Sequence, residues 1–232
     1  MGGQVPPMGN ERSALTKVIW FGLIWIVGIV AGWVIGFYAF WVSFSSTGLY
    51  NLQPTATPAQ VSAAMAPLFR QLTLLTPVTL APEIVAFVIL TLGLREFAKV
   101  DPHRFSLPST LILVLMAGAV IVAAGTIPLV NSLPDVIAKA PYQSGATPSA
   151  DFISAIGSLF VYFAVVALGG VLALIGGIGG LILGVWRMGT RYDETLLKVG
   201  AICVVIPFLN ILAPILILIG ASSARGRLPG HP

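Results

Sequence analysis

Four long apolar runs, at residues 18–44, 72–94, 108–130 and 152–186, dominate this chain of 232 residues. An α-helix of about 20 apolar residues crosses a hydrocarbon core of about 30 Å, so each run is long enough to span a bilayer. Only 9% of the residues are charged, and the mean hydropathy is +0.97, which leaves too few charges to cover a water-soluble domain. The sequence therefore predicts an all-α, polytopic integral membrane helix bundle with four full spans.

A fifth apolar run, at residues 195–220, is interrupted by Pro207, Asn210 and Pro214. Proline inside a helix removes a backbone hydrogen bond and bends or ends the helix. Irregular backbone at membrane depth is tolerated where protein covers it. Two structures fit this segment, a re-entrant hairpin that turns between the two prolines and a kinked fifth span.

The basic residues predict how the chain is oriented. Cytoplasmic loops of membrane proteins are enriched in Lys and Arg. Two of these residues, Arg70 and Lys139, fall in the loops on one side of the predicted spans. Eight fall on the other side: Arg12, Lys17, Arg95, Lys99, Arg104, Arg187, Arg191 and Lys198. We therefore expect a multi-pass protein of the plasma membrane with a cytoplasmic N-terminus. The hairpin is favoured because it would bring Arg225 and Arg227 to the same basic side.

This orientation implies one transmembrane domain at residues 18–220, between a cytoplasmic tail at 1–17 and a C-terminal tail at 221–232. Extracellular segments are expected at 45–71 and 131–155, with a short amphipathic surface or capping helix at 59–71. Residues 95–104 are expected to form a charged loop. The run at 152–186 exceeds the bilayer thickness, so its first turns stand outside the membrane or the helix breaks at one of two glycine pairs, 169–170 or 176–177.

Glu83 is the one acidic residue deep in a predicted span. A carboxylate in a span is costly, which makes it a candidate ion or proton site together with Asn210. A structural role for Glu83 is favoured over this, because Pro82 suits the first position of a restarting helix and Thr76 and Thr79 could donate hydrogen bonds. A buried salt bridge is a third alternative, and Asn210 could instead bond to freed backbone groups.

Small residues recur at four-residue intervals, a spacing that lets helix backbones approach closely in lipid. The sequence does not say whether the partner helix belongs to the same chain. The predicted helix-packing residues are Gly28, Gly32 and Gly36 in the first span and Gly169, Ala173, Gly177, Gly176, Gly180 and Gly184 in the fourth.

No set of residues predicts catalysis, metal binding or nucleotide binding. His103 and His231 lack a second ligand at metal spacing, and Cys203 is alone in an apolar run. The stretch containing Arg191, Asp193 and Glu194 is expected to be a solvated face. We accordingly expect no enzyme activity, no cofactor, no metal and no nucleic-acid partner.

The stretches at residues 186–202 and 206–215 resemble uncharacterised multi-pass membrane proteins of thermophilic crenarchaea, a domain of unknown function. The resemblance is good over about the last quarter of the chain. It implies an archaeal plasma membrane and carries no assigned activity.

Two functions fit these observations. The first is a non-enzymatic structural or accessory subunit that packs through its glycine faces against other membrane subunits or against itself within the lipid bilayer. The second is a small transporter or channel that uses Glu83 and the broken C-terminal segment.

Overall fold

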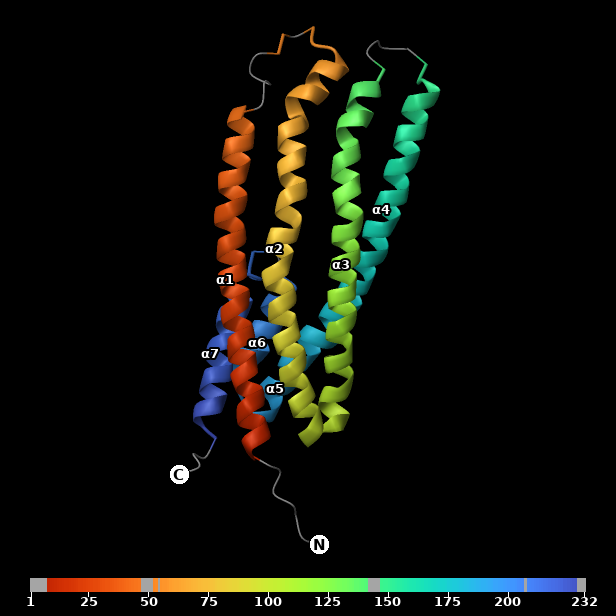
Figure 1. Ribbon diagram of the computed structural model, residues 1–232. Coiled ribbons are helices and arrows are strands. Elements are labelled where there is room, and N and C mark those ends of the chain that lie inside the picture. Colours follow the sequence, from red (N-terminus) through yellow and green to blue (C-terminus); the bar gives the residue numbers. More distant parts are fainter. Residues whose placement is uncertain (1–7, 47–51, 54, 142–146, 207, 229–232) are drawn as a thin grey trace. The chain divides into compact units, whose positions relative to one another are not determined.

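The computed structural model describes residues 8–46, 52–53, 55–141, 147–206 and 208–228, and these form helices joined by short turns (Figure 1). No strand occurs in these ranges. The elements in chain order are α1 (Met8–Ser46), α2 (Pro58–Val100), α3 (Pro102–Lys139), α4 (Ala150–Gly176), the π-helix η2 (Gly177–Ile182), α5 (Leu183–Arg191), α6 (Thr195–Cys203) and α7 (Leu212–Gly226). The predicted all-α class is confirmed.

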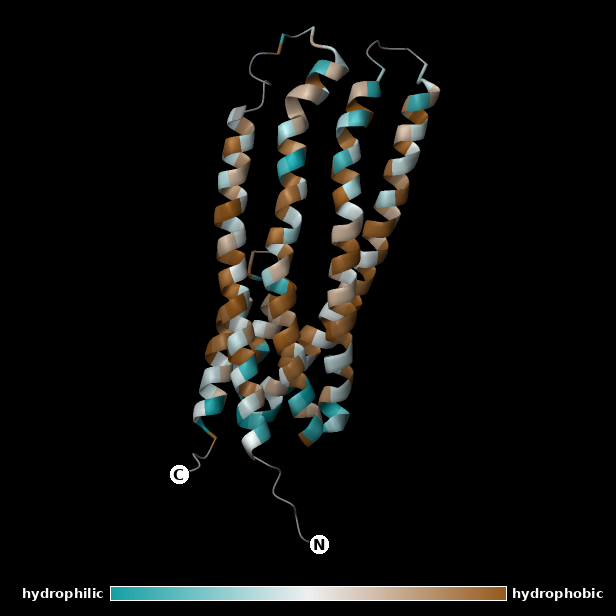
Figure 2. Ribbon diagram, viewed as in Figure 1, coloured by the Kyte–Doolittle hydropathy of each residue, from teal (hydrophilic) through white to brown (hydrophobic). Residues whose placement is uncertain are grey.

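Four helical stretches are long and apolar enough to cross a membrane: Gly9–Ser45, Pro58–Val100, Pro102–Lys139 and Ala150–Arg191. Figure 2 shows hydrophobic residues along the middle of these helices and hydrophilic residues at the start of α1 and at the junction of α2 and α3. The prediction of four spans is confirmed, and the chain is a membrane protein.

Side-chain caps set where three of the long helices begin. Thr57 and Gln60 form a reciprocal capping box at the start of α2, in which the Thr57 backbone N–H donates to the Gln60 side chain at 2.8 Å. The carboxylate of Asp101 accepts from the backbone N–H of Arg104 at 3.2 Å, and Ser149 accepts from that of Phe152 at 3.1 Å. Pro58 and Pro102 each take the first helical position, where a missing N–H costs nothing.

The helices extend well beyond the apolar runs. Residues 8–17, expected as a tail, are the first turns of α1, and Ala14 and Leu15 are fully buried. Residues 59–71, expected as a separate helix, are continuous with α2. The expected charged loop at 95–104 is also helical except at Asp101. Hydropathy marks where a helix contacts lipid, whereas backbone hydrogen bonding continues until a cap or a proline ends it.

The long helix that contains α4, η2 and α5 does not break at either glycine pair. It continues through a π-helical turn that begins at Gly177, directly after the second pair. A π-turn inserts one extra residue into the helix, and glycine accommodates this distortion without a side-chain clash. The alternative of a break at 176–177 is therefore wrong, and the helix instead widens locally from Gly177 to Ile182.

The chain divides into two compact units. Unit 1 consists of Met1–Val30, Ala81–Gly118 and Val171–Pro232, and unit 2 of Ala31–Leu80 and Ala119–Gly170. The hydrophobic core cluster belongs to unit 1, where the rings of Phe21, Trp25 and Phe87 pack in tilted pairs with centroids 5.1–5.8 Å apart. Unit 1 also contains the whole C-terminal segment.

Within unit 1, α6 and α7 form an antiparallel helical hairpin. A Cβ on Gly200 of α6 would lie 3.0 Å from the side chain of Ile217 on α7. A Cβ on Gly220 of α7 would lie 2.9 Å from the backbone nitrogen of Leu197 on α6. The segment between them reverses direction in a turn that includes Phe208, whose φ is 68°. Of the two structures predicted for residues 195–220, the chain adopts the hairpin.

Unit 2 is held together by polar contacts between neighbouring helices. Ser43 of α1 donates to Gln71 of α2 at 2.7 Å. Ser62 of α2 donates to the carbonyl of Pro134 on α3 at 2.6 Å. Gly125 of α3 packs against α4, where a Cβ would lie 2.8 Å from Val166. Large apolar side chains are exposed over much of this unit, as expected for helices solvated by lipid.

Candidate functional site

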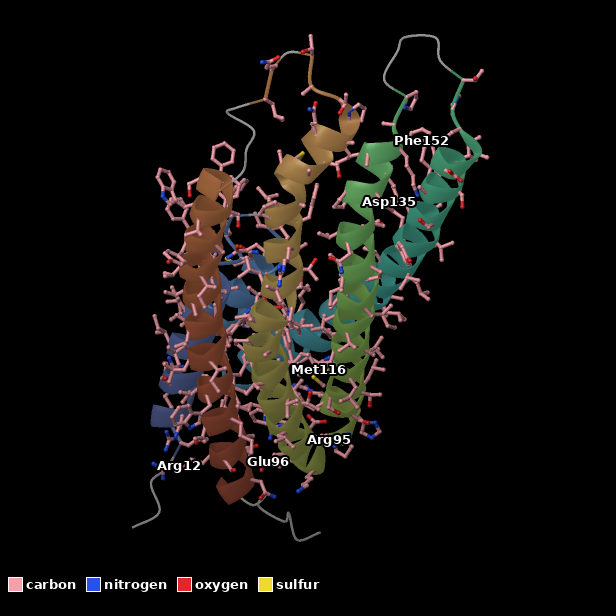
Figure 3. All side chains as sticks on the ribbon, turned by 45° about the horizontal axis from the view of Figure 1, so that its top comes forward. Arg12, Arg95, Glu96, Met116, Asp135 and Phe152 are labelled. Carbon is pink, nitrogen blue, oxygen red and sulfur yellow. The ribbon has the colours of Figure 1, made fainter. Side chains whose placement is uncertain are left out.

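The strongest concentration of polar interactions in unit 1 is a group of ion pairs, here called the ion-pair cluster. Figure 3 labels Glu96 there, close to Arg95 on the same turn of α2. The cluster comprises the pairs Lys17–Glu96, Arg104–Asp101, Arg191–Asp101, Arg191–Glu11 and Arg227–Glu194. It joins α1, α2, the α2–α3 junction, the end of α5 and the end of α7.

Arg191 lies at the centre of the ion-pair cluster. Its guanidinium donates to Glu11 on α1, and it also lies 3.5 Å from the carboxylate of Asp101 between α2 and α3. The side chains of Arg191 and Glu11 are 22% and 12% exposed, so water screens this pair only in part. Arg191 ends α5 and Glu11 is in the first turn of α1, and each charge therefore complements the dipole of its own helix.

Glu194 connects the α5–α6 turn to α7. Its side chain is 6% exposed, accepts a hydrogen bond from Ser223 at 2.9 Å, and forms an ion pair with Arg227 at 2.9 Å. The expectation of a solvated face at Arg191, Asp193 and Glu194 is wrong for two of the three residues. Only Asp193 is solvated, with a side chain that is 98% exposed. Charged residues near the end of a predicted span cannot be assigned to water when their partners lie far away in the sequence.

Two buried polar atoms beside these pairs have no hydrogen-bond partner among the described residues, Oε2 of Glu96 and the hydroxyl of Tyr192. The Tyr192 ring lies 6.1 Å from the ring of Phe97. Burial raises the pKa of Tyr192 above its ordinary value of 10, and the negative charge of Glu11 raises it further. The phenol is therefore neutral at physiological pH.

Glu83, the predicted ion or proton site, is half-buried in unit 1. Thr76 and Thr79 do not bond to it. They donate instead to backbone carbonyls of their own helix, at 3.0 Å and 3.1 Å. No ion pair reaches Glu83 in the described part of the chain, so the buried salt bridge suggested by the sequence has no partner there.

Asn210 lies in the turn between α6 and α7, and its side chain is exposed. Its backbone N–H donates to the carbonyl of Ile206 at 3.1 Å. No hydrogen bond joins Asn210 to Glu83 in the ranges that the structure describes. The two residues of the predicted site are thus both in unit 1 but are not linked by a polar contact.

Some of the predicted helix-packing glycines contact a neighbouring helix, and others have free space where a side chain would lie. A Cβ on Gly28 would lie 2.9 Å from Pro82, and one on Gly32 would lie 3.6 Å from Thr79. Cβ atoms on Gly176, Gly180 and Gly184 would lie 2.2 Å from Leu115, 2.6 Å from Ile112 and 3.2 Å from Leu94. A Cβ on Gly36 or Gly177 would meet no atom within 4 Å. Gly169 is buried and Ala173 is half-buried.

Sequence reasoning did not find the ion-pair cluster. Glu11, Glu96 and Glu194 each lie within a few residues of a basic residue at the end of an apolar run. The repeated occurrence of an acidic residue beside a basic one at these ends is a weak indication that the acidic residues form ion pairs within the protein. The pairing itself depends on which helix ends meet, and spacing along the chain does not reveal this.

No group of three or more His, Cys, Asp or Glu side chains that could hold a metal ion occurs among the residues described. Comparison with known proteins gives no match among curated proteins and none among solved structures. The sequence pattern of one family, DUF973, described as a protein of unknown function, matches residues 11–230. The match covers all the helices from the first turn of α1 to the end of α7, and the chain therefore belongs to the DUF973 family.

Proposed function

We propose that this chain is a non-enzymatic structural or accessory subunit of a larger assembly in an archaeal plasma membrane, with its N-terminus in the cytoplasm. The lipid bilayer and other membrane subunits, or further copies of the chain, are its partners, and nucleic acid is not. The excess of basic residues at the start of α1, around the α2–α3 junction, and in α5 and α6 supports this orientation.

The observation that carries the proposal is that each unit has an open small-residue position on the long helix that contains α4 and η2. Gly170 is the last residue of unit 2, and Gly177, the first residue of η2, belongs to unit 1. A Cβ at either position would meet no atom within 4 Å in the part of the chain that the structure describes. Small residues on a lipid-facing helix let a second helix approach closely, which is the main source of helix association in a membrane.

Purification in mild detergent, followed by identification of co-purifying subunits, tests this function. Gly170→Leu and Gly177→Leu should reduce recovery of the partner or the homo-oligomer severalfold, because each leucine occupies the contact surface. Gly157→Leu is the matched control, since Gly157 is also open but faces another side of α4. A protein that remains a monomer without partners under these conditions contradicts the proposal.

Transport is the second candidate function, supported by the half-buried Glu83 without an ion-pair partner among the described residues. A carboxylate at that depth could bind a cation or carry a proton. Proton or cation flux into proteoliposomes that is abolished by Glu83→Gln would establish transport. Equal flux by wild type, Glu83→Gln and empty vesicles would exclude it.

A further inference from the structure

A basic groove lies in unit 1 between the beginning of α1 and the end of α7. Arg12 and Ile19 line it from α1, and Ser222, Arg225 and Gly226 line it from α7. Figure 3 labels Arg12 near the N-terminal end of α1. Ser222 is exposed, and a Cβ on Gly226 would meet no atom of the described residues within 4 Å, so this side of α7 is open.

Among the residues that the structure describes, neither arginine of this groove has a carboxylate partner. The chain has eight acidic residues, and all of them lie in the described ranges. The acids of the ion-pair cluster are used by other bases, namely Lys17, Arg104, Arg191 and Arg227. No ion pair of Arg12 or Arg225 occurs within those ranges, although both side chains line the same groove.

The helix dipoles make this arrangement more unusual. Arg225 lies in the last turn of α7, where a positive charge is favourable. Arg12 directly follows the first turn of α1, near the positive end of that helix, where a positive charge is unfavourable. The groove therefore has two positive charges, and one of them lies near the positive end of a helix dipole. A bound anion would offset the repulsion between these charges.

The apolar side of the groove indicates what kind of anion fits. Ile19 lines it, and the next residue, Trp20, is 55% exposed, as is common for tryptophan at a membrane interface. A site with guanidinium and hydroxyl donors on one side and an aliphatic side chain on the other suits an amphipathic ligand. Basic pockets between transmembrane helices bind the head groups of anionic lipids in this way.

We propose that Arg12, Ser222 and Arg225 bind the phosphate of an anionic phospholipid, with Ile19 against the upper part of a hydrocarbon chain of that lipid. Guanidinium groups bind phosphate through paired, charge-assisted hydrogen bonds. The bound lipid would replace the missing carboxylate and join the beginning of α1 to the end of α7.

Native mass spectrometry of the full chain in detergent, titrated with phosphatidylglycerol or phosphatidylcholine, tests the site. Wild type should retain phosphatidylglycerol in preference to phosphatidylcholine. Arg12→Gln with Arg225→Gln should weaken phosphatidylglycerol binding about 30-fold, because each basic group near an anionic surface contributes severalfold to affinity. Arg12→Lys with Arg225→Lys should retain most of the binding, which distinguishes loss of charge from loss of fold.

The matched control is Arg95→Gln with Lys99→Gln, which also removes two positive charges from unit 1. Neither residue forms an ion pair within the described ranges, and neither lines the groove. This control should bind phosphatidylglycerol like wild type. An equal loss in both double variants would overturn the proposal, because net charge alone would then explain the affinity. Displacement of the lipid by millimolar inorganic phosphate would overturn it as well, by showing a site for free phosphate.

Discussion

Arg191, the last residue of α5, forms an ion pair with Glu11 in the first turn of α1, 180 positions earlier in the chain. The same guanidinium lies beside Asp101 at the junction of α2 and α3. One side chain therefore ties together three helix ends of unit 1. The predictions below follow from this pair and from the contacts around it.

Arg191→Gln should lower the free energy of unfolding by about 2 kcal/mol, because it leaves the largely buried carboxylate of Glu11 without a counter-charge. The measurement is a thermal or SDS-induced unfolding transition in detergent. Lys139→Gln is the control, since the Lys139–Asp135 pair is exposed and its loss should cost less than about 0.5 kcal/mol. Equal effects of the two substitutions would show that the pair of Arg191 is no stronger than a surface pair.

Tyr192 should make unit 1 sensitive to alkaline pH. Its pKa is raised in the folded chain, so unfolded chains lose this proton first as the pH rises. The contribution of Tyr192 to stability is complete below about pH 10 and is lost as the pH increases further. Tyr192→Phe should remove the part of the alkaline loss of stability that is due to Tyr192. The difference in tyrosinate absorbance between wild type and Tyr192→Phe should appear only well above pH 10. A difference spectrum that titrates at the ordinary tyrosine pKa would contradict the buried environment.

Gly176→Ala should destabilise the protein by about 1–3 kcal/mol, because the new Cβ would lie 2.2 Å from the backbone nitrogen of Leu115 on α3. Gly177→Ala is the matched control one residue later, where a Cβ would meet no atom within 4 Å. Its effect should be within about 0.5 kcal/mol of wild type. Comparable unfolding transitions for the two variants would be inconsistent with the close approach of α3 at Gly176.

Glu194→Gln should loosen the end of α7, because the neutral amide holds Arg227 less strongly than a carboxylate does. Trypsin cleaves after arginine, so the rate of cleavage at Arg225 and Arg227 reports how often this end opens. We expect a severalfold increase over wild type. Asp193→Asn, which changes a solvated carboxylate, should leave the rate unchanged.

Hydropathy alone predicted the architecture, since four runs of sufficient length can only be solvated by lipid. It placed the helix ends poorly. The apolar run at 72–94 lies inside a helix that begins at Pro58, because Thr57 and Gln60 cap the chain there. The capping pattern is visible in the sequence, but the amphipathic stretch at residues 59–71 also fits a separate surface helix.

The charged residues were harder to interpret, for a physical reason. Whether Glu194 is solvated or buried depends on the return of α7, which brings Ser223 within 2.9 Å of its carboxylate. The sequence allowed two paths for that segment and therefore two environments for Glu194. Glu83 differs, because its depth in a span follows from the length of the apolar run and requires no knowledge of its partners.

The proposed membrane topology of the chain consists of four crossings and the hairpin of α6 and α7. Labelling of single cysteines from one side of the membrane, in a Cys203→Ser background, tests it most directly. Gly226→Cys and Lys99→Cys should label from the same side of the membrane, and Thr147→Cys only from the opposite side. Labelling of Gly226→Cys together with Thr147→Cys would mean that residues 195–220 cross the membrane once and would contradict the account.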